Sequence, residues 1–177
     1  DAEPKYSKDD LLRGMFGSGA NLQTQFEKCS FGKLKWVPSE HGVIDIELPE
    51  TAEFYDFDRF EMISSAHAII KERYGVDKVS ELSDRVLMCL PPKTGVWAAS
   101  AAIGHWRAQF NNDWCLSLTG TMHEIGHTLG LRHANKDGIA YADSTGYMSS
   151  GSPIAGWPKK CFNAYNNWQL GFFKDRE

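Results

Sequence analysis

The sequence lacks any long hydrophobic run, since no stretch approaches the roughly 18–20 consecutive apolar residues that a transmembrane helix needs. It also lacks an excess of positive charge: its 177 residues carry a formal net charge of −4, and no basic patch is evident. These absences argue against a helical membrane protein and give no support to nucleic-acid binding. No internal repeat, low-complexity tract or linker is present, so we expect one domain over residues 1–177.

Cysteine is scarce, and no two cysteines form the C-x-x-C pair of a second metal site. The four are Cys29, Cys89, Cys115 and Cys161. An even number suits two disulfides in a secreted protein, with three possible connectivities, and the alternative is four reduced, buried thiols in a cytosolic one. No signal peptide is visible, and the polar start at Asp1 is what we expect of a trimmed mature domain.

The most informative run covers residues 123–133 and reads H-E-x-x-H-x-x-G-x-x-H. A helix places His123 and His127, four residues apart, on one face within reach of a single ion. Glu124 lies about 100° around such a helix, where it can bond a water on the metal. Gly130 can take positive φ and turn the chain so that His133 returns as the third ligand. Three neutral histidines leave one position open, which is typical of catalytic zinc.

Less specific interpretations of the run also exist. The core H-E-x-x-H arises by chance in helices, and Thr121 with Glu124 fits a capping box in which Glu124 is merely structural. The added glycine and third histidine argue against chance. An intact Glu124 argues against an inactive module that has kept its zinc.

On these residues the chain resembles the metzincin metallopeptidases, which share the extended motif and a downstream turn with a methionine beneath the metal. Tyr147-Met148-Ser149 matches that turn, so the resemblance implies Met148 as the Met-turn residue, with an ordinary core methionine as the alternative. The tail is most similar to the gametolysin family, in the runs KCFNA at 160–164 and NWQLG at 167–171. Ser149 departs from the glycine expected after the methionine.

The resemblance and the hydrophobic periodicity together predict an α+β, metzincin-like fold. It has a mixed, twisted five-stranded sheet with an antiparallel edge strand, backing helices, a zinc-binding active-site helix and a C-terminal helix below the cleft. We expect strands over 33–37, 43–48, 85–90, 101–109 and 114–118, and helices over 7–15, 21–27, 57–74, 121–131 and 162–170. The plan implies an upper subdomain of about 1–133 and a lower one of about 134–177. It places Cys89 and Cys115 on neighbouring strands, which favours the pairs 89–115 and 29–161.

The resemblance implies a secreted, extracellular zinc endopeptidase that hydrolyses extracellular proteins, with matrix or cell-wall glycoproteins as candidate substrates. His123, His127 and His133 hold the zinc, and Glu124 activates a zinc-bound water. Substrate backbone adds as a strand to the edge at Ala101, Ala102, Ile103 and Gly104. Ser150 and Trp157 lie in the segment expected to wall a specificity pocket, although Trp157 also suits a core position.

Several further expectations depend on the same resemblance. Tyr147 and His105 are candidates, by residue type alone, for a second donor to the oxyanion. Asp137, Asp143 and Ser144 could form a structural calcium site, with a solvated loop as the alternative. We expect a monomer that binds a protein or peptide and, in its precursor, a pro-segment inhibitor. The rival functions are a catalytically inactive binding or adhesion module that has kept its zinc, a zinc hydrolase of non-peptide substrates, and an interaction domain with structural zinc.

Overall fold

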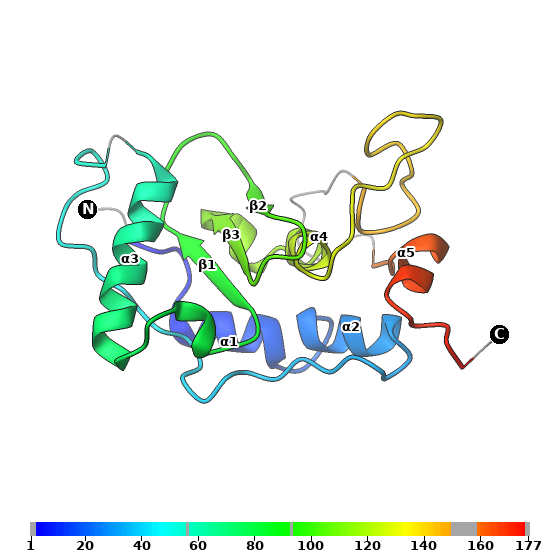
Figure 1. Ribbon diagram of the computed structural model, residues 1–177, viewed down its shortest axis with the longest axis horizontal. Coiled ribbons are helices and arrows are strands. Elements are labelled where there is room, and N and C mark those ends of the chain that lie inside the picture. The colour runs from blue at the N-terminus through cyan, green and yellow to red at the C-terminus, as the bar shows by residue number, and fades with distance from the viewer. Residues whose placement is uncertain (1–2, 56, 93, 150–158, 176–177) are drawn as a thin grey trace.

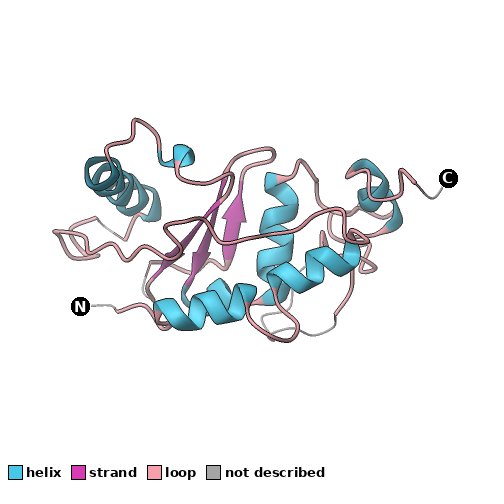
Figure 2. Ribbon diagram, turned by 90° about the horizontal axis from the view of Figure 1, so that it is seen from below, coloured by secondary structure: helices cyan, strands magenta, loops and turns pink. Residues whose placement is uncertain are grey.

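A computed structural model describes residues 3–55, 57–92, 94–149 and 159–175. The element order is α1 (Lys8–Phe16), α2 (Leu22–Cys29), α3 (Arg59–Tyr74), η1 (Val79–Glu81), β1 (Val86–Leu90), β2 (Ala99–Ala101), β3 (Arg107–Asn111), η2 (Asn112–Leu116), α4 (Leu118–Thr128) and α5 (Ala164–Gln169). The strands lie between α3 and α4, while α1 and α2 follow one another along a third side (Figures 1 and 2). None of the helices in the described residues is both long and apolar enough to cross a membrane.

The first three helices form where local signals predict them. Ser7 caps α1 in a reciprocal capping box with Asp10, and Asn21 caps α2 in the same way with Thr24. Gly75 ends α3 in the left-handed conformation, with φ of 65°, which a residue without Cβ adopts at little cost. The predictions for 7–15, 21–27 and 57–74 are therefore confirmed to within two residues at each end.

The sheet has three strands in the order β1-β3-β2, so the predicted five-stranded sheet is wrong. β1 runs parallel to β3, pairing Val86 with Arg107, and β2 runs antiparallel to β3, pairing Ala99 with Phe110. The sheet is therefore mixed, with β2 as an antiparallel edge strand, as predicted. The expected edge strand over 101–109 is instead two elements, because the chain turns at 102–106 between β2 and β3.

Three other predicted strands do not form. Segments 33–37 and 43–48 run as irregular chain, although the second alternates in burial much as a strand would. Its apolar side chains pack against the core without a partner strand, as Val43 does against the cluster around Leu11. Residues 114–118 fall mainly in η2, because Asn112 takes a φ of 44° directly after β3 and Ser117 then caps α4.

The main core lies between α2, α4 and the C-terminal segment. Its buried side chains include Leu22, Phe26, Met122, Ile125, Met148 and Phe162.

The disulfide Cys29–Cys161 joins α2 to the segment before α5, and Cys89–Cys115 joins β1 to η2, so the favoured pairing is confirmed. The predicted C-terminal helix forms as α5, capped by Asn163 and followed by Gly171 at φ of 73°.

Candidate metal centre

The histidine-bearing helix α4 is buried along its entire length. It begins at Ser117, whose side chain accepts a hydrogen bond from the backbone N–H of Gly120. Thr121 lies inside the helix and donates to the carbonyl of Ser117. Thr121 is therefore not the cap, and the alternative in which Glu124 only closes a capping box does not apply.

The helix ends one residue after His127, and the chain then reverses. Gly130 has a φ of 98°, a conformation that favours glycine, and Leu131 donates its N–H to the carbonyl of Gly126 at 3.0 Å. This turn brings His133 back against the helix. The turn expected at Gly130 is confirmed, although the helix stops at Thr128 rather than at 131.

The three histidines meet through one nitrogen each. Nε2 of His127 lies 3.1 Å from Nε2 of His123 and 3.0 Å from Nε2 of His133. Candidate ligand atoms of all three fall within 4.8 Å of one another. Two nitrogens bound to one tetrahedral zinc at about 2.0–2.1 Å stand roughly 3.3 Å apart, so the observed spacing fits a shared ion.

Backbone carbonyls fix which ring nitrogens carry hydrogen. Nδ1 of His123 lies 2.8 Å from the carbonyl of Tyr147, and Nδ1 of His127 lies 2.8 Å from that of Leu131. Because a carbonyl only accepts, each Nδ1 must donate, and in the neutral ring each Nε2 then presents a lone pair. Lone pairs that face one another at about 3 Å repel unless a cation lies between them, so the cluster could hold a metal ion.

Burial keeps the histidines in the neutral form that binds metal. His123 and His127 are 8% and 6% exposed, and His133 is half-buried. Desolvation lowers the pKa of His123 to about 4 and also lowers the pKa values of His127 and His133. At neutral pH all three imidazoles are therefore uncharged.

Glu124 lies beside the cluster, and its carboxylate is only partly satisfied. It is 7% exposed, and its Oε2 has no hydrogen-bond partner among the described residues. Desolvation raises the pKa of Glu124 to about 8, while a backbone hydrogen bond at Ala101 acts in the opposite direction. A divalent cation held by the histidines would favour the ionised carboxylate. This buried carboxylate oxygen, which has no hydrogen-bond partner and lies next to the histidine cluster, is arranged to accept a proton or hydrogen bond from a bound molecule.

Met148 packs against α4 at Gly126. It is fully buried, and an added Cβ on Gly126 would stand 2.5 Å from its sulfur and 3.0 Å from the Phe162 ring. The absent side chain at Gly126 thus lets Met148 and Phe162 pack against the helix backbone. The turn at 146–149 also supplies the Tyr147 carbonyl that orients His123. The Met-turn role of Met148 stays a prediction.

The residues expected at the substrate edge are only partly on a strand. Ala101 ends β2, the edge strand, whereas Ala102, Ile103 and Gly104 lie in the following turn. The N–H of Gly104 is already engaged by the carbonyl of His127 at 2.8 Å. Ser150 and Trp157, expected in the pocket wall, lie outside the described residues.

Tyr141 is a site residue that the sequence did not indicate. Its ring centroid lies 3.9 Å from that of His133 and 6.2 Å from that of His123, with the latter pair stacked at 15°. Its hydroxyl is close enough to Glu124 for that carboxylate to help raise the pKa of Tyr141, although burial contributes more. The only signal was an aromatic residue eight positions after His133 in a polar, glycine-containing loop.

The two oxyanion donors suggested by residue type lie elsewhere. Tyr147 is 2% exposed, and its hydroxyl accepts a hydrogen bond from the backbone of Lys160 at 3.3 Å. His105 packs beside Trp106, and its Nδ1 accepts from the backbone of Arg107. Neither side chain is thus arranged as a donor at the histidine cluster.

The calcium site suggested at Asp137, Asp143 and Ser144 stays a prediction. Asp143 accepts hydrogen bonds from Thr145 through Oδ1 and from Asn163 through Oδ2, so both of its oxygens tie the loop to the segment before α5. Within the part of the chain that is described, the three histidines are the one group of three or more metal-ligating side chains that come together.

Comparison with known proteins agrees with this geometry. No curated protein and no solved structure matches the chain. The family model described as gametolysin peptidase M11 matches residues 4–176. Because that match spans nearly the whole chain and includes the three histidines and the buried glutamate, the protein belongs to the gametolysin family of peptidases.

Proposed function

We propose that the protein is a zinc-dependent endopeptidase in which His123, His127 and His133 hold the metal and Glu124 is the general base. The observation that carries the proposal is that the Nε2 atoms of three imidazoles converge beside the unpartnered Oε2 of Glu124. In two of the rings the Nδ1 hydrogen bond leaves Nε2 with the lone pair that a metal ion needs. Three histidines with no fourth protein ligand leave room for water and substrate, as in catalytic rather than structural zinc sites.

Zinc held by these three histidines would lower the pKa of a coordinated water toward about 7 and would polarise the scissile carbonyl. Glu124 takes one proton from the attacking water as its oxygen bonds to the carbonyl carbon. The same carboxyl then gives that proton to the amide nitrogen as the C–N bond breaks, so proton and water are both accounted for. Burial of Glu124 excludes bulk water that would compete for the proton.

The substrate backbone is proposed to lie along β2. β2 is one of the two outer strands of the described sheet, and its last residue, Ala101, hydrogen-bonds Glu124 through its backbone. A peptide added at this edge would run past the general base and use main-chain hydrogen bonds that tolerate varied side chains. A peptide is thereby favoured over a non-peptide substrate.

Tyr141 is proposed to donate a hydrogen bond to the carbonyl oxygen of the substrate as negative charge develops there. Tyr141→Phe should keep full metal content and lower kcat about 10–100-fold, with KM nearly unchanged, because the bond strengthens only in the transition state. We expect a smaller effect than for a fully buried donor, because the Tyr141 side chain is 40% exposed. Steady-state kinetics on casein would measure it.

Tyr165→Phe is the matched control, because Tyr165 is an exposed tyrosine near the start of α5. If Tyr141→Phe matches wild type while Tyr141→Ala loses activity, the ring acts by packing on His133 and the hydroxyl has no catalytic role. Loss of metal from Tyr141→Phe would make it a ligand instead.

Metal content and chelation test the proposal as a whole. We expect one zinc per chain by mass spectrometry, cleavage of casein that a chelator abolishes, and recovery when zinc is restored. Zinc without any cleavage would favour a binding module, and purified chain that can neither contain nor take up zinc would overturn the proposal.

The proposed setting is extracellular. The disulfides Cys29–Cys161 and Cys89–Cys115 support it, since such bonds persist in oxidising compartments. Matrix and cell-wall glycoproteins remain the proposed substrate class. A monomer, and a pro-segment that covers the cleft in the precursor, are proposed on the family resemblance alone.

A further inference from the structure

A second pocket, of about 380 Å³, opens away from the metal centre between α3, η1 and the start of β3. His67 and Lys71 reach it from α3, Lys78 from the residue before η1, and Trp106 from the residue before β3. His105 and Arg107 flank Trp106, and both, with Lys71, are close enough to His67 to lower its pKa, although burial is the larger cause. Three groups able to carry positive charge thus line the hollow, and two more flank Trp106 in the sequence.

The cations of this pocket have no anionic partners in the described chain. Lys71, Lys78 and Arg107 form none of the ion pairs found there. Arg107 is half-buried, and desolvation lowers the pKa of its guanidinium without an opposing carboxylate. Within the same part of the chain, Nε2 of His67 is buried without a hydrogen-bond partner. Lys71 and Lys78 are exposed to solvent, whereas the charge of half-buried Arg107 would be stabilised by an anion bound beside it.

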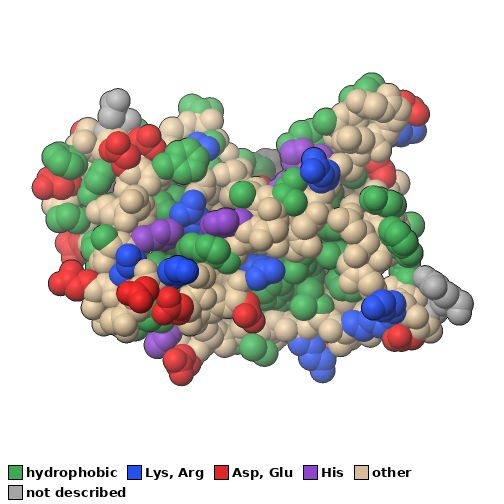
Figure 3. Space-filling model, in the orientation of Figure 1, with side chains coloured by type: hydrophobic (Ala, Val, Ile, Leu, Met, Phe, Trp, Pro, Cys, Tyr) green, Lys and Arg blue, Asp and Glu red, His purple; other side chains and the backbone are tan. Residues whose placement is uncertain are grey.

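Acidic side chains near the pocket do not balance it. Asp77 is the one acid in its lining, and Glu81 uses Oε1 to accept a hydrogen bond from the backbone of Lys78. In a chain of net charge −4, Figure 3 shows histidine, lysine and arginine side chains gathered between α3 and β1, with acidic ones at the lower border. The local sign of charge is thus opposite to that of the whole molecule.

The pocket is connected to the metal centre through a short turn. Trp106 ends the turn 102–106, in which Gly104 donates its N–H to the carbonyl of His127, a residue of the metal cluster. The same turn begins at the end of β2, where the substrate is proposed to run. A substrate leaving the cleft along this turn would meet the cations.

We propose that the pocket lined by His67, Lys71, Lys78 and Trp106, with Arg107 close to His67, is an accessory site for oxyanion groups of the protein substrate, either carboxylates of an acidic segment or phosphates on its side chains. Lys71, Lys78 and Arg107 supply the charge, and the rings of Trp106 and His67 form one wall of the hollow. The role in substrate binding rests on the proposed peptidase function, whereas binding of the anion itself does not.

Direct binding is the first test. A fluorescein-labelled hexaglutamate peptide should bind the wild-type chain, with an affinity that falls as salt is added, as measured by fluorescence anisotropy. Lys71→Glu/Lys78→Glu should weaken binding by at least about tenfold, and Lys71→Gln/Lys78→Gln by less. The control Lys28→Glu/Lys35→Glu makes the same charge change at exposed positions on and after α2, and should alter the dissociation constant less than about twofold.

Cleavage of β-casein, phosphorylated or enzymatically dephosphorylated, is the second test. A lower KM for the phosphorylated form that disappears in Lys71→Glu/Lys78→Glu, with kcat unchanged, identifies phosphate as the group recognised. Equal KM values, with hexaglutamate competing in wild type but not in the variant, identify carboxylates.

Two results would overturn the inference. One is wild-type chain that does not bind hexaglutamate, and the other is pocket variants that bind it as well as wild type does. If the anion binds but neither casein experiment responds to the variants, the site has no role in substrate binding. The anisotropy measurement needs no peptide cleavage, so it would still test anion binding if the peptidase proposal failed.

Discussion

Glu124→Gln should abolish peptide cleavage while leaving the metal in place. The amide has nearly the shape of the carboxylate, so packing around the 7% exposed side chain changes little. An amide cannot accept the proton of the attacking water, and loss of general-base catalysis lowers kcat by about 10²–10⁴-fold. Casein cleavage, with zinc content measured on the same preparation, checks both halves of this expectation.

Glu61→Gln is a matched control, since it removes the same charge from an acid in the first turn of α3. It should behave as wild type. If Glu124→Gln instead loses its zinc, Glu124 is part of the metal site rather than the base. Cleavage within about tenfold of wild type would mean that another group takes the proton, contrary to the proposed role.

The parts of the fold that the sequence predicted are those fixed by neighbouring residues. Ser7 with Asp10 and Asn21 with Thr24 satisfy the free N–H groups of their own helices, and Gly75 ends α3 by its own conformation. The spacing from His123 to His133 is equally local, because one helix turn and one glycine turn determine where the three side chains meet.

The errors come from features that depend on distant partners. A strand exists only where another strand offers hydrogen bonds, and residues 43–48 alternate in burial without one. The helix expected from about Thr121 begins one turn earlier, because Ser117 caps it. Apolar spacing alone could not distinguish these cases.

The two proposed functional features that the sequence does not indicate have the same origin. Tyr141 reaches His133 because the loop backbone takes a φ of 65° at that residue, which no pattern in the sequence indicates. The basic residues in and beside the pocket are spread between 67 and 107, so no basic run appears in the chain. Folding α3 against the start of β3 brings these residues together.

Removing the disulfide Cys29–Cys161 should cost more stability than any other single change considered. It closes a loop with a sequence separation of 132 residues, against 26 for Cys89–Cys115. Loop-closure entropy predicts a loss in the free energy of unfolding of about 5 kcal/mol for Cys29→Ala/Cys161→Ala and about 3.5 kcal/mol for Cys89→Ala/Cys115→Ala. Denaturant unfolding of both variants measures the difference.

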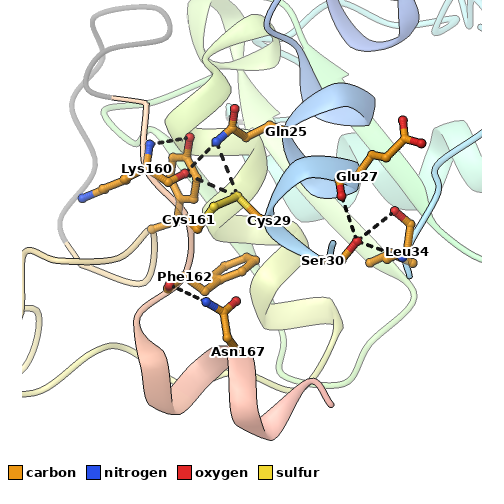
Figure 4. Close-up of a disulfide and its surroundings, with 10 residues drawn as sticks. Gln25, Glu27, Cys29, Ser30, Leu34, Lys160, Cys161, Phe162 and Asn167 are labelled. Atoms are coloured by element: carbon orange, nitrogen blue, oxygen red, sulfur yellow. Dashed lines mark hydrogen bonds between the residues drawn. A yellow bond between two sulfur atoms is a disulfide. The ribbon is translucent and has the colours of Figure 1, made fainter. Parts of the chain in front are cut away.

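The location of this disulfide connects that loss to the metal centre. Cys161 precedes Phe162, and Figure 4 shows both residues with the disulfide to Cys29. The ring of Phe162 lies 5.7 Å from that of Phe26 on α2 and also packs at Gly126 of α4. Gln25 further ties α2 to the carbonyl of Lys160 at 2.7 Å. Without the covalent link, packing and hydrogen bonds alone hold this segment beneath the histidines, so Cys29→Ala/Cys161→Ala should also release zinc at lower denaturant than Cys89→Ala/Cys115→Ala. Equal zinc retention in the two variants would mean that the C-terminal segment does not support the metal centre.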